Sequence, residues 1–176
     1  MTQRNRILGI DPGSRLTGFG VLDFAGDTPT YVTCGTVKSQ KGTFPDRLKQ
    51  IFESVGEIVA EYEPEIIAIE TVFMARNAGS ALKLGQARGA AMVAATNNQV
   101  PVAEYSARQI KQSVVGTGAA DKTQVQHMVA SILKLPGTPQ ADAADALAVA
   151  ICHAHSYDSL AKMAGKATKT VRGRLR

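Results

Sequence analysis

Residues 6–14 read Arg-Ile-Leu-Gly-Ile-Asp-Pro-Gly-Ser, a short apolar run that ends in an acid and a turn. Apolar runs of this length, bounded by turn residues, are typical of strands buried in a sheet, so we predict a buried strand that ends at Asp11. The turn lacks the Lys of a phosphate-binding loop and the spacing of a dinucleotide-binding loop. A nucleotide cradle is therefore not indicated, and Asp11 is an acid at the end of a buried strand.

The same arrangement occurs again after a meander and a helix. Residues 17–23 and 30–38 predict two further strands of an antiparallel meander, and apolar residues at three- and four-residue spacings then predict an amphipathic helix that Pro64 ends. Residues 66–69 form another apolar run, and this run ends in Glu70. Two buried strands are thus predicted to end in an acid.

The second half of the chain alternates helical and extended patterns. The predicted elements are a small-residue helix over residues 77–97, a strand over 102–105, and helices over 107–115, 122–135 and 140–155. Three early strands followed by alternating helices and strands indicate one α/β domain with a mixed sheet. We assign residues 1–158 to this domain and residues 159–176 to a basic, flexible C-terminal tail.

Composition excludes several classes of protein. With 176 residues and 44% apolar content, the chain suits one folded domain and is not intrinsically disordered. No apolar run is long enough to cross a bilayer, and the first residues lack a secretory signal, so we expect a cytoplasmic protein with no membrane partner. Cys34 and Cys152 lie far apart without zinc-ligand spacing, and we expect both to be buried, reduced thiols.

The net charge of +5 is unevenly distributed along the chain. Residues 46–70 carry seven acids and two bases, residues 73–134 carry seven bases and two acids, and residues 162–176 carry six bases and no acid. A basic stretch and a basic tail beside an acid-rich stretch suit a polyanionic ligand such as nucleic acid. The alternative is that these charges form an ordinary solvated surface.

Two more acids stand near the start of the last predicted helix. Asp142 and Asp145 are three residues apart, so they share one helical face. If this helix packs across the two strand ends, four carboxylates meet there, and their mutual repulsion requires bound protons or cations. Because oxygen ligands favour hard ions, the expected cation is Mg²⁺ or Mn²⁺.

Each acid taken alone also has a structural interpretation. Asp11 could form a turn, and Asp142 and Asp145 could complement the positive end of their helix. Glu70, which follows four apolar residues, has no local turn to form, so a purely structural interpretation explains it less well than the other three acids. Two cations held by shared carboxylates can act on a phosphodiester, one by activating water and the other by stabilising the leaving oxygen. Together the acids therefore predict metal-dependent hydrolysis.

Four other residues are candidates for contacts to nucleic acid. Arg76, Lys111 and Lys122 lie in the basic stretch and could contact phosphates, although each alone could be an ordinary surface residue. Phe73 follows the strand that ends in Glu70, where an aromatic ring could stack on a base or anchor the loop.

Four stretches of the sequence together resemble the RuvC family of bacterial Holliday junction resolvases, from about Arg6 to about His155. These stretches are Leu-Gly-Ile-Asp-Pro-Gly-Ser at 8–14, Ala-Ile-Glu at 68–70 with Phe73, Ala-Leu-Lys-Leu-Gly-Gln-Ala-Arg-Gly at 81–89 and Gln-Ala-Asp-Ala-Ala-Asp-Ala-Leu at 140–147. Their order and spacing are jointly specific. The resemblance implies a ribonuclease-H-like fold, with a mixed five-stranded sheet and helices on both faces.

The resemblance also implies a mechanism and partners. It implies a homodimer that nicks two opposed strands of a four-way DNA junction with two Mg²⁺ ions, for which Mn²⁺ can substitute, and that works with the RuvA and RuvB branch-migration proteins. The residues that match the family's metal-binding catalytic acids are Asp11, Glu70, Asp142 and Asp145. Lys111 and Lys122 match its phosphate-side basic residues, and Phe73 its stacking aromatic residue. Thr71 stands where relatives often have a longer polar side chain.

Two other functions are compatible with parts of the sequence. The segment around Asp11 also resembles the phosphate hairpin of actin-like and sugar-kinase ATPases, but those proteins need two related domains, for which 176 residues leave little room. A non-enzymatic junction-binding module is the other alternative. A Mg²⁺-dependent nicking assay on a synthetic four-way junction separates all three functions.

Overall fold

The computed structural model describes residues 5–25, 28–71 and 77–171, with side chains described up to Tyr157. Five strands form one mixed sheet in the order β3-β2-β1-β4-β5. Their bounds are Asn5–Asp11 for β1, Leu16–Ala25 for β2, Thr28–Lys38 for β3, Ile66–Glu70 for β4 and Val102–Tyr105 for β5. The meander β1-β2-β3 is antiparallel, whereas β4 and β5 run parallel to β1. The predicted mixed five-stranded sheet is confirmed.

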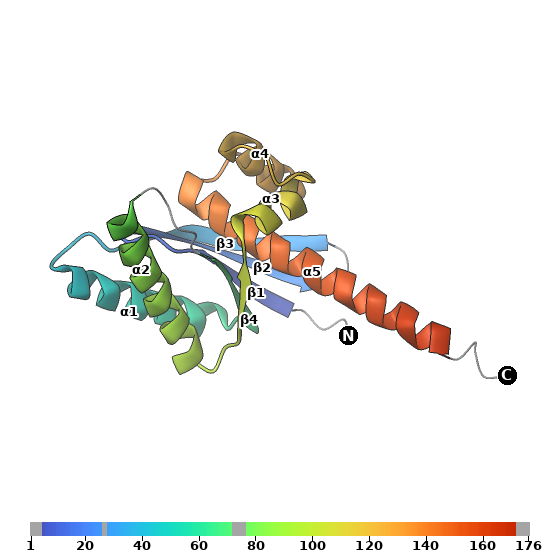
Figure 1. Ribbon diagram of the computed structural model, residues 1–176, viewed down its shortest axis with the longest axis horizontal. Coiled ribbons are helices and arrows are strands. Elements are labelled where there is room, and N and C mark those ends of the chain that lie inside the picture. The colour runs from blue at the N-terminus through green and yellow to red at the C-terminus, as the bar shows by residue number, and fades with distance from the viewer. Residues whose placement is uncertain (1–4, 26–27, 72–76, 172–176) are drawn as a thin grey trace.

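Helices cover both faces of this sheet (Figure 1). Helices α1 (Phe44–Tyr62) and α2 (Ala78–Asn97) lie on one face, and α3 (Ala107–Val115), α4 (Lys122–Ile132) and α5 (Ala141–Val171) lie on the other. Each face has its own hydrophobic core, because every strand buries alternate side chains on opposite sides.

The alternation along β1 and β4 decides which way the two strand-end acids point. Leu8 and Ile10 of β1 belong to the core under α1 and α2, whereas Ile7 belongs to the core under α5. In β4, Ile69 faces α1 and α2, and Ala68 faces α5. Continuing the alternation by one residue places Asp11 and Glu70 on the face that α5 covers.

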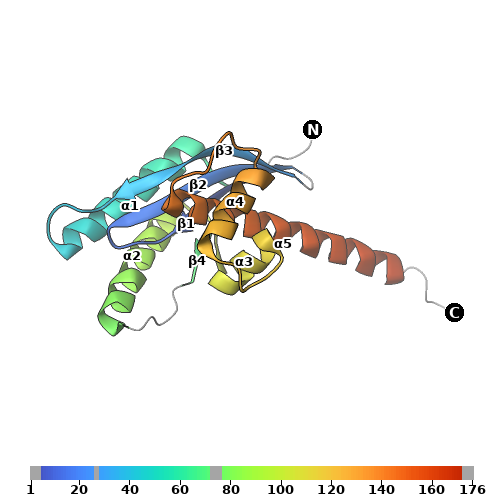
Figure 2. The same cartoon turned by 90° about the horizontal axis from the view of Figure 1, so that it is seen from above.

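Glycines in β1 and β2 bring α5 unusually close to the sheet. A Cβ atom added at Gly9 would lie 2.1 Å from the carbonyl oxygen of Ala146, and one added at Gly18 would lie 1.9 Å from the carbonyl oxygen of Asp142. At Gly20 an added Cβ would lie 2.7 Å from the Leu147 side chain. The helix backbone therefore rests on strand positions that have no side chain, and α5 crosses β1 and β2 with its first turn at the strand ends (Figure 2).

Three helices start with the capping residues that their sequences indicate. Thr43 with Asp46, Ser106 with Gln109, and Asp121 with Gln124 form reciprocal capping boxes at α1, α3 and α4. These caps satisfy backbone N–H groups that a helix leaves unpaired at its start. They fix α3 and α4, which carry Lys111 and Lys122, against the first half of α5.

Two predicted helix ends differ from the structure. Helix α4 ends at Ile132 rather than at residue 135, because Lys134 adopts a positive φ of 52° and the Leu135 N–H donates to the Ala130 carbonyl oxygen. Helix α5 continues beyond the predicted end at residue 155 to Val171. No Pro or Gly stop follows residue 155 directly, so the backbone of the predicted tail is helical as far as Val171. The mobility of this tail stays a prediction.

Cys34 and Cys152 are both free thiols; Cys152 is buried as expected, whereas Cys34, on β3, is partly exposed, so the expectation that it is buried is wrong. Within the part of the chain that the structure describes, none of the helices is long and apolar enough to cross a membrane.

The close approach of α5 to the sheet predicts the effect of a single methyl group. Gly18→Ala should lower the free energy of unfolding by roughly 2 to 4 kcal/mol, because the new Cβ meets a backbone carbonyl that cannot move independently of α5. Urea denaturation of the metal-free protein measures this change. Gly56→Ala in α1 is the matched control, since an added Cβ there meets only Asn98 Nδ2, at an ordinary contact distance of 3.8 Å, and Ala favours a helix by about 0.5 to 1 kcal/mol. Equal stability of the Gly18→Ala variant and the wild type would contradict this packing.

Candidate active site

The site begins at the adjacent ends of β1 and β4. The parallel register pairs Ile10 with Ile69, so the next residues, Asp11 and Glu70, follow side by side at the same sheet edge. Asp11 is also paired with Gly18 of β2, the glycine that supports the backbone of Asp142. The first turn of α5 thus lies against the strand ends, and Asp142 and Asp145 come from that turn and the next.

Electrostatic interactions show how closely the four acids are gathered. Burial and then the negative charges of Glu70, Asp145 and Asp142 raise the pKa of Asp11 from 3.8 to about 7, although Lys122 opposes this shift. Burial and the charge of Asp145 also raise the pKa of Glu70, against the lowering effects of Lys111 and Lys122. The four acids and two lysines predicted from sequence therefore share one electrostatic environment.

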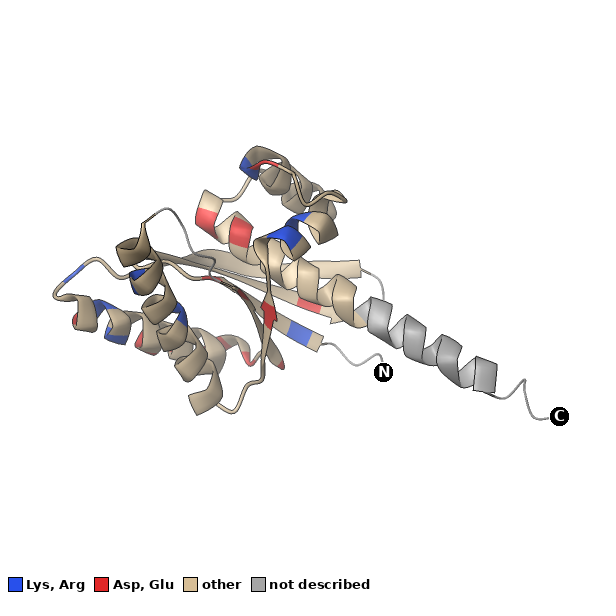
Figure 3. Cartoon of the chain, in the orientation of Figure 1, with Lys and Arg blue, Asp and Glu red and all other residues tan. Residues whose placement is uncertain are grey.

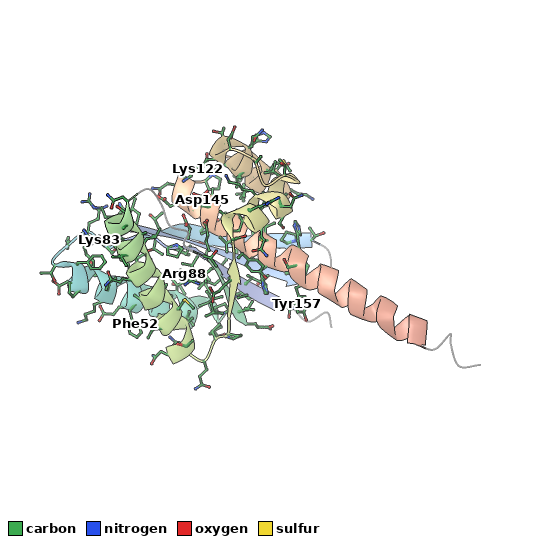
Figure 4. All side chains as sticks on the ribbon, in the orientation of Figure 1. Phe52, Lys83, Arg88, Lys122, Asp145 and Tyr157 are labelled. Carbon is green, nitrogen blue, oxygen red and sulfur yellow. The ribbon has the colours of Figure 1, made fainter. Side chains whose placement is uncertain are left out.

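Among the described residues, Lys122 forms a salt bridge with one acid of this cluster. Its ammonium group lies 2.7 Å from Oδ2 of Asp145, and the hydrogen bond to Asp145 raises the pKa of Lys122 (Figure 4). Figure 3 shows the acidic positions at the start of α5 near basic positions on α3 and α4. Lys122 is therefore held at the acids and is not an isolated surface charge.

A cleft of about 190 Å³ lies beside two of the acids and both lysines. Its charged lining consists of Glu70, Asp145, Lys111 and Lys122, and its apolar lining of Ala107, Ile110, Val125 and Ala148; Asp11 and Asp142 do not line it. Because carboxylates and ammonium groups line the same cleft, it suits a ligand that carries a phosphate together with a cation.

The donor set fits a hard divalent cation. Every acidic ligand candidate offers carboxylate oxygens, two of the acids have raised pKa values, and a lysine ammonium already pairs with a third. Among the described residues, however, no three Asp, Glu, His or Cys side chains are arranged as a ready metal-binding group. One of the four acids, Asp145, pairs with Lys122.

Two of the predicted DNA-binding residues lie outside the described residues, namely Phe73 and Arg76. Two histidines of α5 pair with side chains other than the four acids. His153 is buried and lies 2.8 Å from the Tyr105 hydroxyl, whereas His155 lies 3.1 Å from the Ser113 hydroxyl.

Sequence reasoning missed one residue that contacts the site. Arg88 of α2 donates from Nε to the carbonyl oxygen of Glu70 at 3.1 Å and pairs with Glu104. Arg88 is one of two basic residues in a helix of small residues, and it was counted in the basic stretch and in the stretch 81–89 of the family resemblance without a role at the site. A half-buried arginine that bonds to backbone leaves no periodic signal in the sequence.

Comparison with known proteins gives the family. The sequence model of the family described as "Crossover junction endodeoxyribonuclease RuvC" matches residues 7–153. Proteins of that name from Pseudoalteromonas atlantica and Colwellia psychrerythraea are 64% and 65% identical to this chain, over 97% of this chain and 98% of their own length.

Solved structures agree with this result. RuvC from Thermus thermophilus, in a structure described as a complex with Holliday junction substrate, is 35% identical and superposes with a TM-score of 0.82 over 88% of this chain and 96% of its own. A yeast mitochondrial Holliday junction resolvase, Ydc2, shares 12% identity with a TM-score of 0.59, which shows a common fold.

The mixed sheet and the acids at its strand ends define a nuclease of the ribonuclease-H-like class. The chain belongs to the RuvC family of crossover junction endodeoxyribonucleases. It is therefore a structure-specific endonuclease of Holliday junctions, and its reaction depends on a divalent metal ion. Of the three functions compatible with the sequence, family membership supports the nuclease.

The raised pKa of Asp11 predicts a pH dependence of stability. When the pKa of an acid is higher in the folded than in the unfolded chain, the protein loses stability as pH rises from the unfolded value of 3.8 to the folded value of about 7. Asp11→Asn removes this titration. The free energy of unfolding of the metal-free variant, relative to that of wild type, should therefore be higher at pH 8 than at pH 4, by on the order of 3 kcal/mol. Urea denaturation at both pH values measures the difference.

The control is Glu57→Gln, which removes an exposed acid of α1. A pH-dependent change of similar size in this variant would show that loss of any acid, and not the place of Asp11, produces the effect. An Asp11→Asn variant whose stability relative to wild type is the same at pH 4 and pH 8 would show that Asp11 is not held in this cluster.

Proposed function

We propose that this endonuclease nicks two opposed strands of a four-way junction symmetrically, and that Asp11, Glu70, Asp142 and Asp145 are its catalytic acids, acting in recombination and DNA repair. The observation that carries the proposal is the shared electrostatic environment of these acids at one edge of the sheet. Acids so placed bind cations in preference to remaining mutually repelled, and cations held there can bind a phosphodiester.

The acids would hold two Mg²⁺ ions, for which Mn²⁺ can substitute. Bound there, the ions would supply activation of water and stabilisation of the leaving oxygen. The chain's own contribution is to hold carboxylates from two rigid strands and one rigid helix at a fixed edge, so that the phosphate meets a preorganised site. Whether Asp145 binds a cation directly depends on its release from Lys122.

Basic and aromatic residues would hold the DNA around the acids. Lys111 and Lys122 line the cleft and would counter the charge of the scissile phosphate. We also propose, from the family resemblance, that Phe73 stacks on a base at the opened junction and that Arg76 contacts a phosphate.

The proposed assembly is a homodimer, because a junction with two-fold symmetry presents two equivalent scissile strands. Helix α2 is the proposed contact. Its Leu82 and Val93 side chains are 69% and 57% exposed, and Gly85 has open space around it among the described atoms. We further propose that the dimer works with RuvA and RuvB, and that it acts in the cytoplasm, where the bacterial chromosome lies.

The proposed catalytic role of Glu70 predicts a separation of cleavage from binding. Glu70→Gln should lower the nicking rate of a synthetic four-way junction by a factor of at least about 100, because an amide cannot replace a carboxylate ligand. The junction dissociation constant, measured by gel shift in Ca²⁺ or EDTA, should change little. Nicking at the wild-type rate would remove Glu70 from the mechanism.

The two lysines should differ from Glu70 in their effect. Lys111→Ala or Lys122→Ala should lower the nicking rate, or reduce by about 1 the slope of log affinity against log salt concentration. The reason is that each substitution removes one phosphate contact. Lys49→Ala, which removes an exposed lysine of α1, is the control. If neither the rate nor the slope changes in either variant, the lysines do not face the phosphate.

A further inference from the structure

Arg88 connects α2 to the strand end that carries Glu70. Its Nε donates to the carbonyl oxygen of Glu70 at 3.1 Å, and its Nη2 pairs with the carboxylate of Glu104 on β5. The Arg88 side chain is only 19% exposed and its bond to the Glu70 carbonyl is partly buried, whereas the Glu104 side chain is 48% exposed. Figure 4 shows Arg88 between α2 and the sheet.

At its end, β4 is no longer paired with β1, its neighbour on one side. The register between β1 and β4 ends at Ile10 and Ile69, and Pro12 has no N–H with which β1 could extend the pairing. On the β5 side, the N–H of Thr71 donates to the carbonyl oxygen of Tyr105 at 2.8 Å. Glu70 is thus the position at which the sheet loses one neighbour, and Arg88 supplies a donor there.

We propose that Arg88 is a positioning residue for Glu70, an inference that rests on the proposed catalytic role of that acid. Strand alternation places the Glu70 side chain on the face of α5, whereas Arg88 comes from α2 on the opposite face. Arg88 does not line the cleft that holds Glu70, Lys111 and Lys122. It therefore acts through the backbone, where fixing the Glu70 carbonyl restricts the rotation that would swing the carboxylate away from the other acids.

Glu104 has a supporting role in this arrangement. The Nε and Nη2 donors lie on one edge of the planar guanidinium, so the Glu104 carboxylate holds that edge and directs Nε at the Glu70 carbonyl. The neighbouring residue Ala87 is fully buried in the core under α2, which keeps the helix at a fixed height over the strand.

Three substitutions of Arg88 separate its hydrogen bond from its charge. In Arg88→Gln the amide nitrogen lies the same number of bonds from Cα as Nε does, so a donor is kept and the charge is lost. Arg88→Lys keeps the charge but has no donor at that position. Arg88→Met keeps a stem of similar length and loses both.

The expected result is that the donor, and not the charge, decides activity. At saturating junction and Mn²⁺, the single-turnover nicking rate of Arg88→Met and Arg88→Lys should fall about tenfold or more, as is typical when a residue that supports a metal ligand is lost, whereas Arg88→Gln should stay within about threefold of wild type. Calorimetry should show weaker Mn²⁺ binding in the same two variants. The junction dissociation constant and its salt dependence should match wild type in all three.

Parallel measurements keep the outcomes distinct. Tm values identify any variant whose fold is impaired, and should Arg88→Met not fold, the contrast between Arg88→Lys and Arg88→Gln decides alone. Wild-type nicking and Mn²⁺ affinity in Arg88→Lys, or an equal loss in Arg88→Gln and Arg88→Lys, would overturn the proposal. So would a weaker, less salt-dependent junction affinity, which would show that Arg88 contacts DNA. If Glu70→Gln nicks normally in the same assay, the proposed function of Glu70 fails, whatever the Arg88 variants do.

Discussion

The whole arrangement depends on the contact between α5 and the glycines of β1 and β2. Helices usually rest on a sheet through a layer of side chains, but at Gly9 and Gly18 the backbone of α5 lies where a Cβ atom would otherwise be. This contact lowers the first turns of α5 onto the strand ends. Without it, Asp142 and Asp145 would stand farther from Asp11, and the sheet edge would carry acids from two strands only.

The packing that gathers the acids also opposes their ionisation. Burial and mutual repulsion raise the pKa of Asp11 to about 7 and raise the pKa of Glu70 as well, so the metal-free fold carries unfavourable charge at this edge. Lys122 relieves part of it through Asp145, and Lys111 lowers the pKa of Glu70. The remaining repulsion is the thermodynamic reason why a divalent cation should bind there. Raised carboxylate pKa values of this kind are common at catalytic sites.

Much of the fold and of the acid cluster could be predicted from sequence, because those features depend on local patterns. An apolar run that ends in an acid marks both Asp11 and Glu70, and a three-residue spacing marks Asp142 and Asp145 as one helical face. The end of α5 was predicted wrongly, because helical residues continue to Val171 without an apolar period or a stop signal. The roles of Gly18 and Arg88 could not be predicted, because both depend on which distant backbone atoms lie opposite them.

We propose that folding brings acids from β1, β4 and α5 together as a site for divalent cations. A crystal structure of the protein soaked in Mn²⁺, with anomalous scattering used to locate the metal, tests this proposal. We expect an anomalous peak within bonding distance of carboxylate oxygens from Asp11 and at least one of Glu70, Asp142 and Asp145. Mn²⁺ bound elsewhere, with these carboxylates free of metal at saturating concentration, would refute the proposed site.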